Sequence, residues 1–136
     1  MELTDSLLIA SSGMRAQSER MRVVAENIAN ANSVALSPDG KPYRRKIISF
    51  TNEMDRELGL SVVKTDRITR DRAPFQLRFE PGHPAANGDG YVEYPNVNSL
   101  VEMMDMREAQ RSYQANLKVL ETTRSLAGRT LDLLRG

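Results

Sequence analysis

The sequence predicts an α+β protein in which two long antiparallel terminal α-helices, coiled-coil-like and ordering on assembly, flank a small β-rich middle domain. All six prolines, six of the seven aromatic residues and five of the eight glycines lie between Pro38 and Pro95. Proline interrupts helices and aromatic residues favour strands. Both ends instead carry apolar residues at helical spacing. We therefore expect an N-terminal helix in 1–32, a β-rich domain with loops in 33–97 and a C-terminal helix in 98–136.

The N-terminal helix is predicted by a cap and a seam. Thr4, Asp5 and Ser6 offer capping side chains. Apolar and small residues then follow at alternating spacings of four and three, which is the heptad pattern of a coiled coil. The seam contains Leu3, Leu7, Ala10, Met14, Gln17, Met21, Val24, Ile28 and Ala31. We expect the helix to end within Asn27–Asn32, because asparagine tolerates the left-handed conformation found at helix C-termini.

The middle of the chain contains four strand candidates. Residues 43–50 and 60–68 are rich in β-branched side chains, 75–80 alternates apolar with polar residues, and 91–94 forms a short fourth candidate. Turn clusters rich in proline, glycine and asparagine separate them. These segments predict a small sheet with a thin core, which is marginally stable when left alone.

The C-terminal helix is predicted to begin with a capping box, Ser99-x-x-Glu102, and to run from Ser99 to Leu134. Its seam again alternates spacings of three and four. The seam contains Met103, Met106, Gln110, Tyr113, Leu117, Leu120, Arg124, Ala127, Leu131 and Leu134. Over this length the helix would extend about 54 Å.

Each seam needs a covering surface, because an amphipathic helix gains most of its stability from packing. Within one chain the two helices can cover each other. However, Gln17, Gln110 and Arg124 are polar seam positions that one helix pair buries poorly. Polar residues in a seam commonly fix the register or the number of partners. The pattern favours packing between chains, and a self-contained helical hairpin is the alternative.

Composition and motifs argue against catalysis. The 19 basic and 18 acidic residues nearly balance, and there is no cysteine, so thiol catalysis and cysteine-ligated zinc are excluded. The single histidine, His83, lies in a Pro/Gly turn near Asp89 without an evident nucleophile. Asn87–Gly90 is a turn that lacks the alternating carboxylates and the terminal glutamate of a calcium loop. We expect no catalytic residue, metal or cofactor.

A basic cluster lies in the second strand candidate and the segment after it. It contains Lys64, Arg67, Arg70 and Arg72 and could contact phosphate groups. Asp66 and Asp71 are interleaved with these cations, so the pattern favours a solvated or interface face. Residues 103–106 add three methionines, whose helical spacing favours a core or seam position.

Two terminal segments resemble the signatures of bacterial flagellar rod and hook axial proteins. The first comprises Ser12-Gly13-Met14-x-Ala16-Gln17, then Met21 and the run 27–32. The second extends from Glu102-Met103-Met104 through residues 109–116. Three middle segments, 42–46, 80–84 and 90–98, resemble those of proximal rod subunits. The resemblance covers nearly the whole chain.

The resemblance implies a non-enzymatic structural subunit of the proximal rod of the flagellar basal body. Such subunits polymerise into the helical drive shaft that transmits torque to the hook and filament. The terminal helices would form the inner layer, and the middle domain would project outward. The implied partners are copies of the chain, the rod proteins FlgB, FlgF and FlgG, the base adaptor FliE and the flagellar type III export apparatus. Nucleic acid and direct membrane insertion are not expected.

The first residues lack the basic start and long apolar stretch of a cleavable signal peptide, so composition alone suggests the cytoplasm. The resemblance replaces this with export, without cleavage, to the rod on the periplasmic side.

The seams and signatures together predict where contacts form. The predicted assembly interface comprises Leu7, Met14, Met21, Val24, Asn27, Ile28, Asn30, Met103, Met106, Tyr113, Asn116, Leu117, Leu120 and Leu131. The middle-domain motif comprises Tyr43, Arg44, Pro81, Gly82, His83 and Pro84. Two other functions stay open at this point. One is a soluble cytoplasmic adaptor or chaperone that binds a partner helix, and the other is a hydrolase or metal enzyme using His83 with Asp89.

Overall fold

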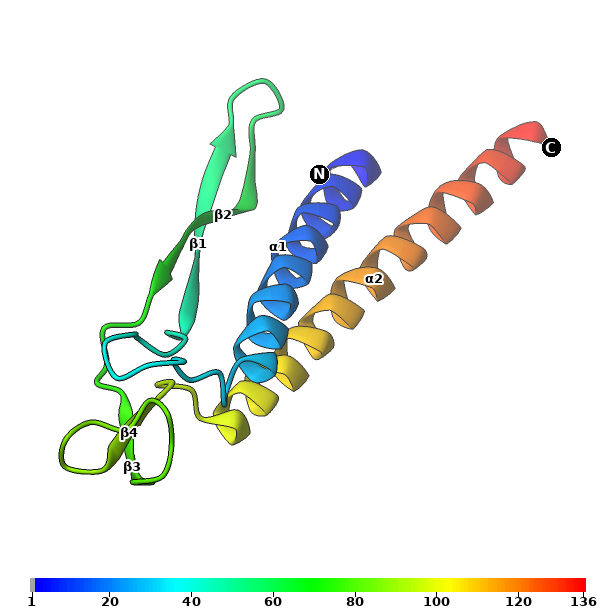
Figure 1. Ribbon diagram of the computed structural model, residues 1–136. Coiled ribbons are helices and arrows are strands. Elements are labelled where there is room, and N and C mark those ends of the chain that lie inside the picture. The colour runs from blue at the N-terminus through cyan, green and yellow to red at the C-terminus, as the bar shows by residue number, and fades with distance from the viewer. Residues whose placement is uncertain (1) are drawn as a thin grey trace. The chain divides into compact units, whose positions relative to one another are not determined.

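Along the described chain, a long helix comes first, four strands follow, and a second long helix comes last (Figure 1). A computed structural model describes residues 2–136, so the first position of the predicted N-terminal segment lies outside it. The elements are α1 (Leu3–Ala29), β1 (Lys46–Asp55), β2 (Leu60–Arg70), β3 (Gln76–Phe79), β4 (Tyr91–Tyr94) and α2 (Ser99–Arg135). This confirms the predicted α+β class. Within residues 2–136, no helix combines the length and the apolar character needed to cross a membrane.

The chain forms two compact units. The first contains residues up to Met21, Ser49–Arg67 and Arg107–Gly136, and the second contains Arg22–Ile48 and Ile68–Met106. Both helices and the β1–β2 hairpin contribute residues to each unit. The predicted parts 1–32, 33–97 and 98–136 follow composition rather than spatial contact, and they stay a prediction.

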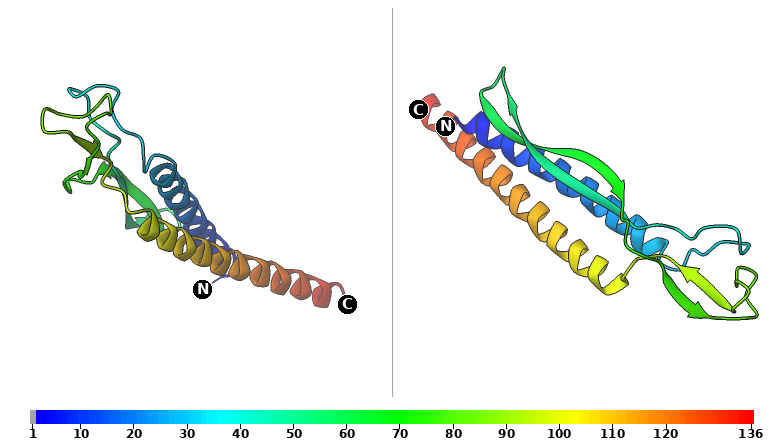
Figure 2. Two further views of the ribbon diagram at one scale, coloured as in Figure 1. Left: turned by 60° about the horizontal axis from the view of Figure 1, so that its bottom comes forward. Right: turned by 90° about the vertical axis from the view of Figure 1, so that its left-hand side faces the viewer.

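In the first unit, α1 and α2 run antiparallel and approach closely at Gly13. A Cβ atom added at Gly13 would lie 2.8 Å from Asn116 Nδ2, so the glycine makes room for this side chain. The Arg20 guanidinium and the Glu108 carboxylate add an ion pair of 3.5 Å. The outer part of the β1–β2 hairpin lies along α1 (Figure 2), where the Val63 amide donates to Ser12 Oγ at 3.3 Å.

The β1–β2 hairpin is a two-stranded sheet that starts later than predicted. Residues 43–45 stay outside β1 because two of their amides bond elsewhere: Tyr43 N donates to Ser33 O and Arg45 N donates to Asn96 Oδ1. At the turn, Asp55 Oδ1 accepts from the amides of Glu57 and Leu58, and Gly59 has a φ of +66°. This positive φ explains why glycine stands at that position.

In the second unit, β3 and β4 pair antiparallel with Phe79 opposite Tyr91. The two rings meet edge to face with centroids 5.3 Å apart. Val92 is fully buried on the opposite face of β4, whereas Phe79 remains 64% exposed. Gly90 lies so close to Phe79 that an added Cβ would stand 2.9 Å from the ring. Val92 of β4 thus enters the core, whereas all four residues of β3 are exposed.

The side chains that cap the start of α2 and the end of α1 differ from those predicted. The predicted capping box is wrong: Asn98 caps α2, because its Oδ1 accepts from the amides of Leu100 and Val101. Glu102 instead turns into the interior. The α1 terminus falls within the predicted 27–32 range, but no described asparagine adopts a positive φ. Asn30 ends the helix through its side chain, which donates to Glu26 O at 2.9 Å and accepts from Ser33 Oγ.

Candidate assembly surface and polar junction

Asn27 is the centre of a buried hydrogen-bond network in the second unit. Its side chain is 1% exposed on α1. Its Nδ2 donates to Lys46 O at 2.9 Å and to Glu102 Oε2 at 3.2 Å. Its Oδ1 accepts from Tyr43 Oη at 2.8 Å and from the Lys46 amide at 2.9 Å. The amide group thus uses both donors and both acceptor positions. We call Asn27, Tyr43, Arg45, Lys46 and Glu102 the polar junction.

Glu102 is fully buried in the first turn of α2 and depends on Arg45. Arg45 Nε donates to Glu102 Oε1, and other guanidinium nitrogens lie 3.3 Å from Asp71 and 3.7 Å from Asp105. A buried carboxylate is tolerated only when it is paired and hydrogen-bonded. Burial disfavours the charge on Arg45, but the bonds and charges of Glu102 and Asp71 raise its pKa. Arg45 therefore keeps its charge, and its bond to Glu102 joins α2 to the segment before β1.

The Tyr43 hydroxyl stays protonated in this surrounding. Burial, followed by the negative charges of Glu26 and Glu102, raises the pKa of Tyr43 above its ordinary value. A protonated hydroxyl is needed for the bond that Tyr43 donates to Asn27. This tyrosine therefore works as a hydrogen-bond donor in the junction.

Arg44 and Asn96 fasten the neighbouring loops. Arg44 donates to the carbonyl oxygens of Asp71 and Ala73 at 2.8 and 3.0 Å, and its guanidinium lies 4.1 Å above the Phe75 ring. Asn96 donates to the same two carbonyl oxygens and accepts from the Arg45 amide. The Tyr43–Lys46 segment thus joins α1, α2 and the loops before β3 and α2. Its chemistry is that of a positioning scaffold.

The second half of the middle-domain motif builds a turn. His83 is half-buried, and its Nδ1 accepts from the Ala85 amide at 3.0 Å. The His83 amide itself donates to Glu80 O. Pro81, Gly82 and Pro84 are exposed around it. His83 therefore has a structural partner in its own turn.

The Asn87–Gly90 segment is also a turn, as predicted. Asn87 Oδ1 accepts from the amides of Asp89 and Tyr91, each at 3.0 Å. Within the described part of the chain, no group of three or more histidine, aspartate or glutamate residues could hold a metal ion.

The predicted interface residues of α1 lie mostly at the inner face of that helix. Val24 and Asn27 are buried, and the other five are half-buried: Leu7, Met14, Met21, Ile28 and Asn30. On α2, Met106, Tyr113, Asn116, Leu117 and Leu120 are half-buried. Met103 and Leu131 are 52% and 59% exposed. The structure thus joins Asn27 to Tyr43 and places Asn116 against Gly13, while Met103 and Leu131 face solvent in the single chain.

The inward face of α2 is displaced from the predicted seam. Among its buried and half-buried positions, one series recurs at spacings of four and three, namely Glu102, Met106, Ala109, Tyr113, Asn116, Leu120, Thr123 and Ala127. Every second position coincides with the predicted seam. The remaining positions carry polar or small residues, which permit close helix packing but gave no apolar signal. Gln110 and Arg124, which the sequence placed in the seam, are exposed.

Many apolar side chains of α2 have no cover in the single chain. Nine exposed large hydrophobic residues lie on the helix: Leu100, Val101, Met103, Met104, Val119, Leu126, Leu131, Leu133 and Leu134. Every residue from Gly128 onward is exposed. Large apolar side chains that stay exposed in such number are candidates for protein–protein contact. In addition, the buried Oε1 of Gln17 on α1 has no hydrogen-bond partner among the described residues.

Sequence reasoning missed Glu102, Arg45 and Asp71 as members of one network. The only available signal was local: Asn27 and Glu102 each stand one position beside a seam residue, where a polar side chain is ordinarily exposed. Their pairing joins positions 75 residues apart, which no spacing rule connects.

Two family models match the chain, one at each end. Residues 7–35 match the model described as flagella basal body rod protein. Residues 89–133 match the C-terminal model of the flagellar basal body rod FlgEFG proteins. These two regions contain most of α1 and most of α2.

Full-length relatives share the same description. The flagellar basal-body rod protein FlgC of Agrobacterium fabrum is 50% identical over 127 residues, covering 93% of this chain and 91% of that protein. The FlgC protein of Salmonella typhimurium is 43% identical over 133 residues and 98% of both chains. The FlgC protein of Borreliella burgdorferi is 38% identical over 154 aligned positions and the full length of both.

Proposed function

The chain belongs to the FlgC family of flagellar basal-body rod proteins, and from that premise we propose how its structure serves the rod. It is a structural subunit of the proximal rod and not an enzyme. The observation that carries this function is the match of 43–50% identity over nearly the full length of both chains. This assignment leaves the adaptor and hydrolase alternatives without support.

We propose that 1–32 and 98–136 form the inner rod domain and that 33–97 forms the domain outside it. The uncovered apolar residues of α2 support this division, because a helical tube surrounds its inner helices with neighbours. Burial of such side chains contributes about 25 cal/mol per Å² of apolar surface. Summed over many subunits, this burial would give the rod its stiffness.

The proposed interface residues fall into two groups. Met103 and Leu131 are exposed in the single chain and are available for direct contact with a neighbour. The remaining residues, among them Asn27, Tyr113 and Asn116, lie at the inward faces of the helix pair. We propose that this second group supports the interface by fixing how α1 and α2 pack. The middle-domain motif acts in the same way through Tyr43 and Arg44.

Membership of the family implies assembly with other rod subunits. We propose that the neighbours are copies of this chain, FlgB, FlgF and FlgG, with FliE at the base. Heterologous contacts that do not close into a ring generate an open helical array.

We further propose that the flagellar type III apparatus exports the chain without cleavage of a signal peptide. A chain without cysteine supports this route, because no disulfide bond has to be reduced before unfolding.

Purification of basal bodies tests this function. A tagged chain expressed in place of the native copy should co-purify with intact basal bodies, and labelling should locate it in the rod on the periplasmic side. Deletion should abolish swimming. Full swimming after deletion, or recovery of the tagged chain only in the soluble fraction, would contradict the proposal.

A further inference from the structure

An arginine surface occupies the base of the β1–β2 hairpin in the second unit. Two open hollows of about 610 and 810 Å³ adjoin there, since Arg44 and Arg70 line both. Lys41 and Lys46 line the first hollow and Arg72 the second. Asp71 is the only carboxylate that lines either of these two hollows. We call Arg44, Arg70 and Arg72 the arginine surface.

The charges of this surface are not neutralised by the described part of the chain. Lys41 pairs with Glu93 and Lys46 pairs with Glu26. The Asp71 carboxylate is turned to Arg45 at 3.3 Å. Arg44 is held by neutral carbonyl oxygens and by the Phe75 ring.

Arg70 and Arg72 are exposed and have no carboxylate partner among residues 2–136. Arginine is the residue best suited to bidentate recognition of carboxylate groups. Clustered like charges repel one another, and an anionic partner relieves that repulsion.

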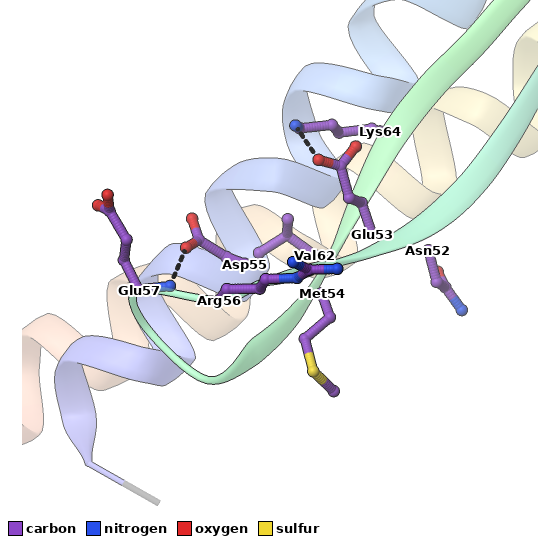
Figure 3. Close-up of a pocket in the computed structure, with 8 residues that line it drawn as sticks. All are labelled: Asn52, Glu53, Met54, Asp55, Arg56, Glu57, Val62 and Lys64. Carbon is purple, nitrogen blue, oxygen red and sulfur yellow. Dashed lines mark hydrogen bonds and ion pairs between the residues drawn. The ribbon is translucent and has the colours of Figure 1, made fainter.

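The hairpin turn supplies a carboxylate for this surface. Glu53, Asp55 and Glu57 lie around a hollow of about 650 Å³ at the tip of the β1–β2 hairpin, together with the cations Arg56 and Lys64 (Figure 3). Glu53 pairs with Lys64 at 2.8 Å, and Asp55 is used by the turn itself. The Glu57 carboxylate points away from the turn and has no cationic partner among the described residues.

The tip also has apolar side chains to bury. Met54 and Leu58 are 63% and 51% exposed, and the hollows of the arginine surface contain Phe75 and Ile47 as apolar lining. The Glu57 carboxylate thus complements the arginine surface in charge, and Met54 and Leu58 complement its apolar lining. Interfaces commonly combine an apolar centre with complementary charges that set orientation.

The order of the strands separates these two surfaces. β1 runs from Lys46 to Asp55 and β2 returns from Leu60 to Arg70, so the turn and the arginine surface lie at opposite ends of one hairpin. A hairpin cannot fold its turn onto its own base. A contact between the two surfaces therefore requires two copies, and it joins unlike surfaces, as an open array demands.

We propose that the hairpin tip of one copy, led by Glu57, binds the arginine surface of a neighbouring copy. The contact lies outside the helix packing and orients adjacent subunits in the rod. This inference rests on the proposed function, because the two copies meet only when they are assembled.

Cysteine cross-linking tests the contact directly, because the chain has no cysteine of its own. Two differently tagged copies, one with Glu57→Cys and one with Arg70→Cys, are expressed together in cells that lack the native copy. Basal bodies are purified, oxidised mildly and analysed on a non-reducing gel. We expect a band that carries both tags. A matched pair of Glu57→Cys with Glu121→Cys, an exposed position on α2, should give at most a trace of such a band.

The outcomes separate this inference from the proposed function. Both tags present in basal bodies without the mixed band would contradict the contact and leave the rod function intact. A mixed band of equal strength in the Glu121 control would also contradict it. Absence of the unmodified chain from basal bodies would contradict the proposed function instead.

Charge reversal gives a second measurement. Arg70→Glu and Glu57→Arg should each reduce the swimming halo several-fold, because each places like charges across the contact. The double variant restores opposite charges and should recover most of the halo. Both residues are exposed, so circular dichroism should show an unchanged fold. A loss confined to Arg70→Glu would indicate another acidic partner, and a double variant no better than the weaker single variant would equally overturn the proposal.

Discussion

Single residues in the polar junction determine how the end of α1 and the start of α2 join the middle of the chain. The Asn27 side chain makes four hydrogen bonds, and Glu102 has no exposed surface. Leaving a buried polar group without its partner costs more than the bond itself contributes. The stability of the second unit should therefore depend strongly on this one asparagine.

The change Asn27→Ala should lower the free energy of unfolding by about 2–3 kcal/mol. It leaves the Lys46 amide without an acceptor and removes one hydrogen bond each from Tyr43 and Glu102. Urea unfolding followed by circular dichroism measures this loss. Asn52→Ala is a matched control at an exposed position and should stay within about 0.5 kcal/mol of the parent. Equal effects of the two changes would show that the junction contributes no special stability.

Tyr43 makes the junction sensitive to alkaline pH. Its pKa in the folded state is raised above the ordinary value of 10.0. The folded state therefore holds this proton more tightly than the unfolded state, and the associated stability is complete below pH 10 and declines as pH rises through the folded pKa. Between pH 9 and 11, the free energy of unfolding should fall less steeply with rising pH for Tyr43→Phe than for the parent chain. Parallel curves for the two proteins would contradict this role.

At the scale of the elements, the sequence pattern predicted where each helix begins and ends, but it did not predict which face of α2 points inward. The bounds of α1 and α2 agree with the expected helices within a few residues. The heptad pattern also predicts Met106, Tyr113 and Leu120 correctly as inward residues. It could not distinguish the face containing Glu102, Asn116 and Thr123 from the one containing Met103, Gln110 and Arg124, because polar side chains on a buried face give no apolar signal.

The middle elements show the same limit. Alternation and turn residues predicted four strands, and four strands form. However, β1 begins at Lys46 because the Tyr43 amide is bonded to Ser33 and the Arg45 amide to Asn96, which lies 51 residues away in sequence. Tertiary partners of this kind leave no local trace. The polar junction was unpredictable for the same reason.

The cap of α2 gives a test at this scale. Asn98→Ala should lower the free energy of unfolding by about 1 kcal/mol, since it removes the acceptor for the Leu100 and Val101 amides. Ser99→Ala should have little effect, because the side chain that caps the helix belongs to the preceding residue. Thermal unfolding of the two variants decides between them, and a larger loss for Ser99→Ala would restore the capping box that the sequence suggested.

The close helix approach at Gly13 provides another comparison. Gly128 is a helical glycine with nothing within 4 Å of an added Cβ, so Gly128→Ala should stabilise the chain by about 0.5–1 kcal/mol. Gly13→Ala should gain less or lose stability, because its Cβ would meet Asn116 at 2.8 Å. Calorimetry should also show that Gly13→Ala costs less stability when Asn116→Ala is present, because the shorter side chain removes the steric clash. Equal stabilisation by both alanines would mean that the helices do not approach closely there.

The described chain leaves nine large apolar residues of α2 exposed. Three of them, Leu131, Leu133 and Leu134, lie in the last turns of the helix, where every residue from Gly128 onward is exposed and no part of the chain covers them. In a rod, neighbouring subunits would supply the missing cover. The central claim is therefore that the exposed leucines of α2 serve assembly rather than the folding of the single chain.

The amount of Leu131→Asp recovered in purified basal bodies tests this claim most directly. Leu131 is 59% exposed, so the isolated variant should unfold at nearly the same urea concentration as the parent chain. Ser125→Asp places the same charge at another exposed position of α2 and should assemble normally. We predict that Leu131→Asp is nearly absent from basal bodies and that its cells do not swim. Recovery of Leu131→Asp at the level of the Ser125→Asp control would contradict the claim.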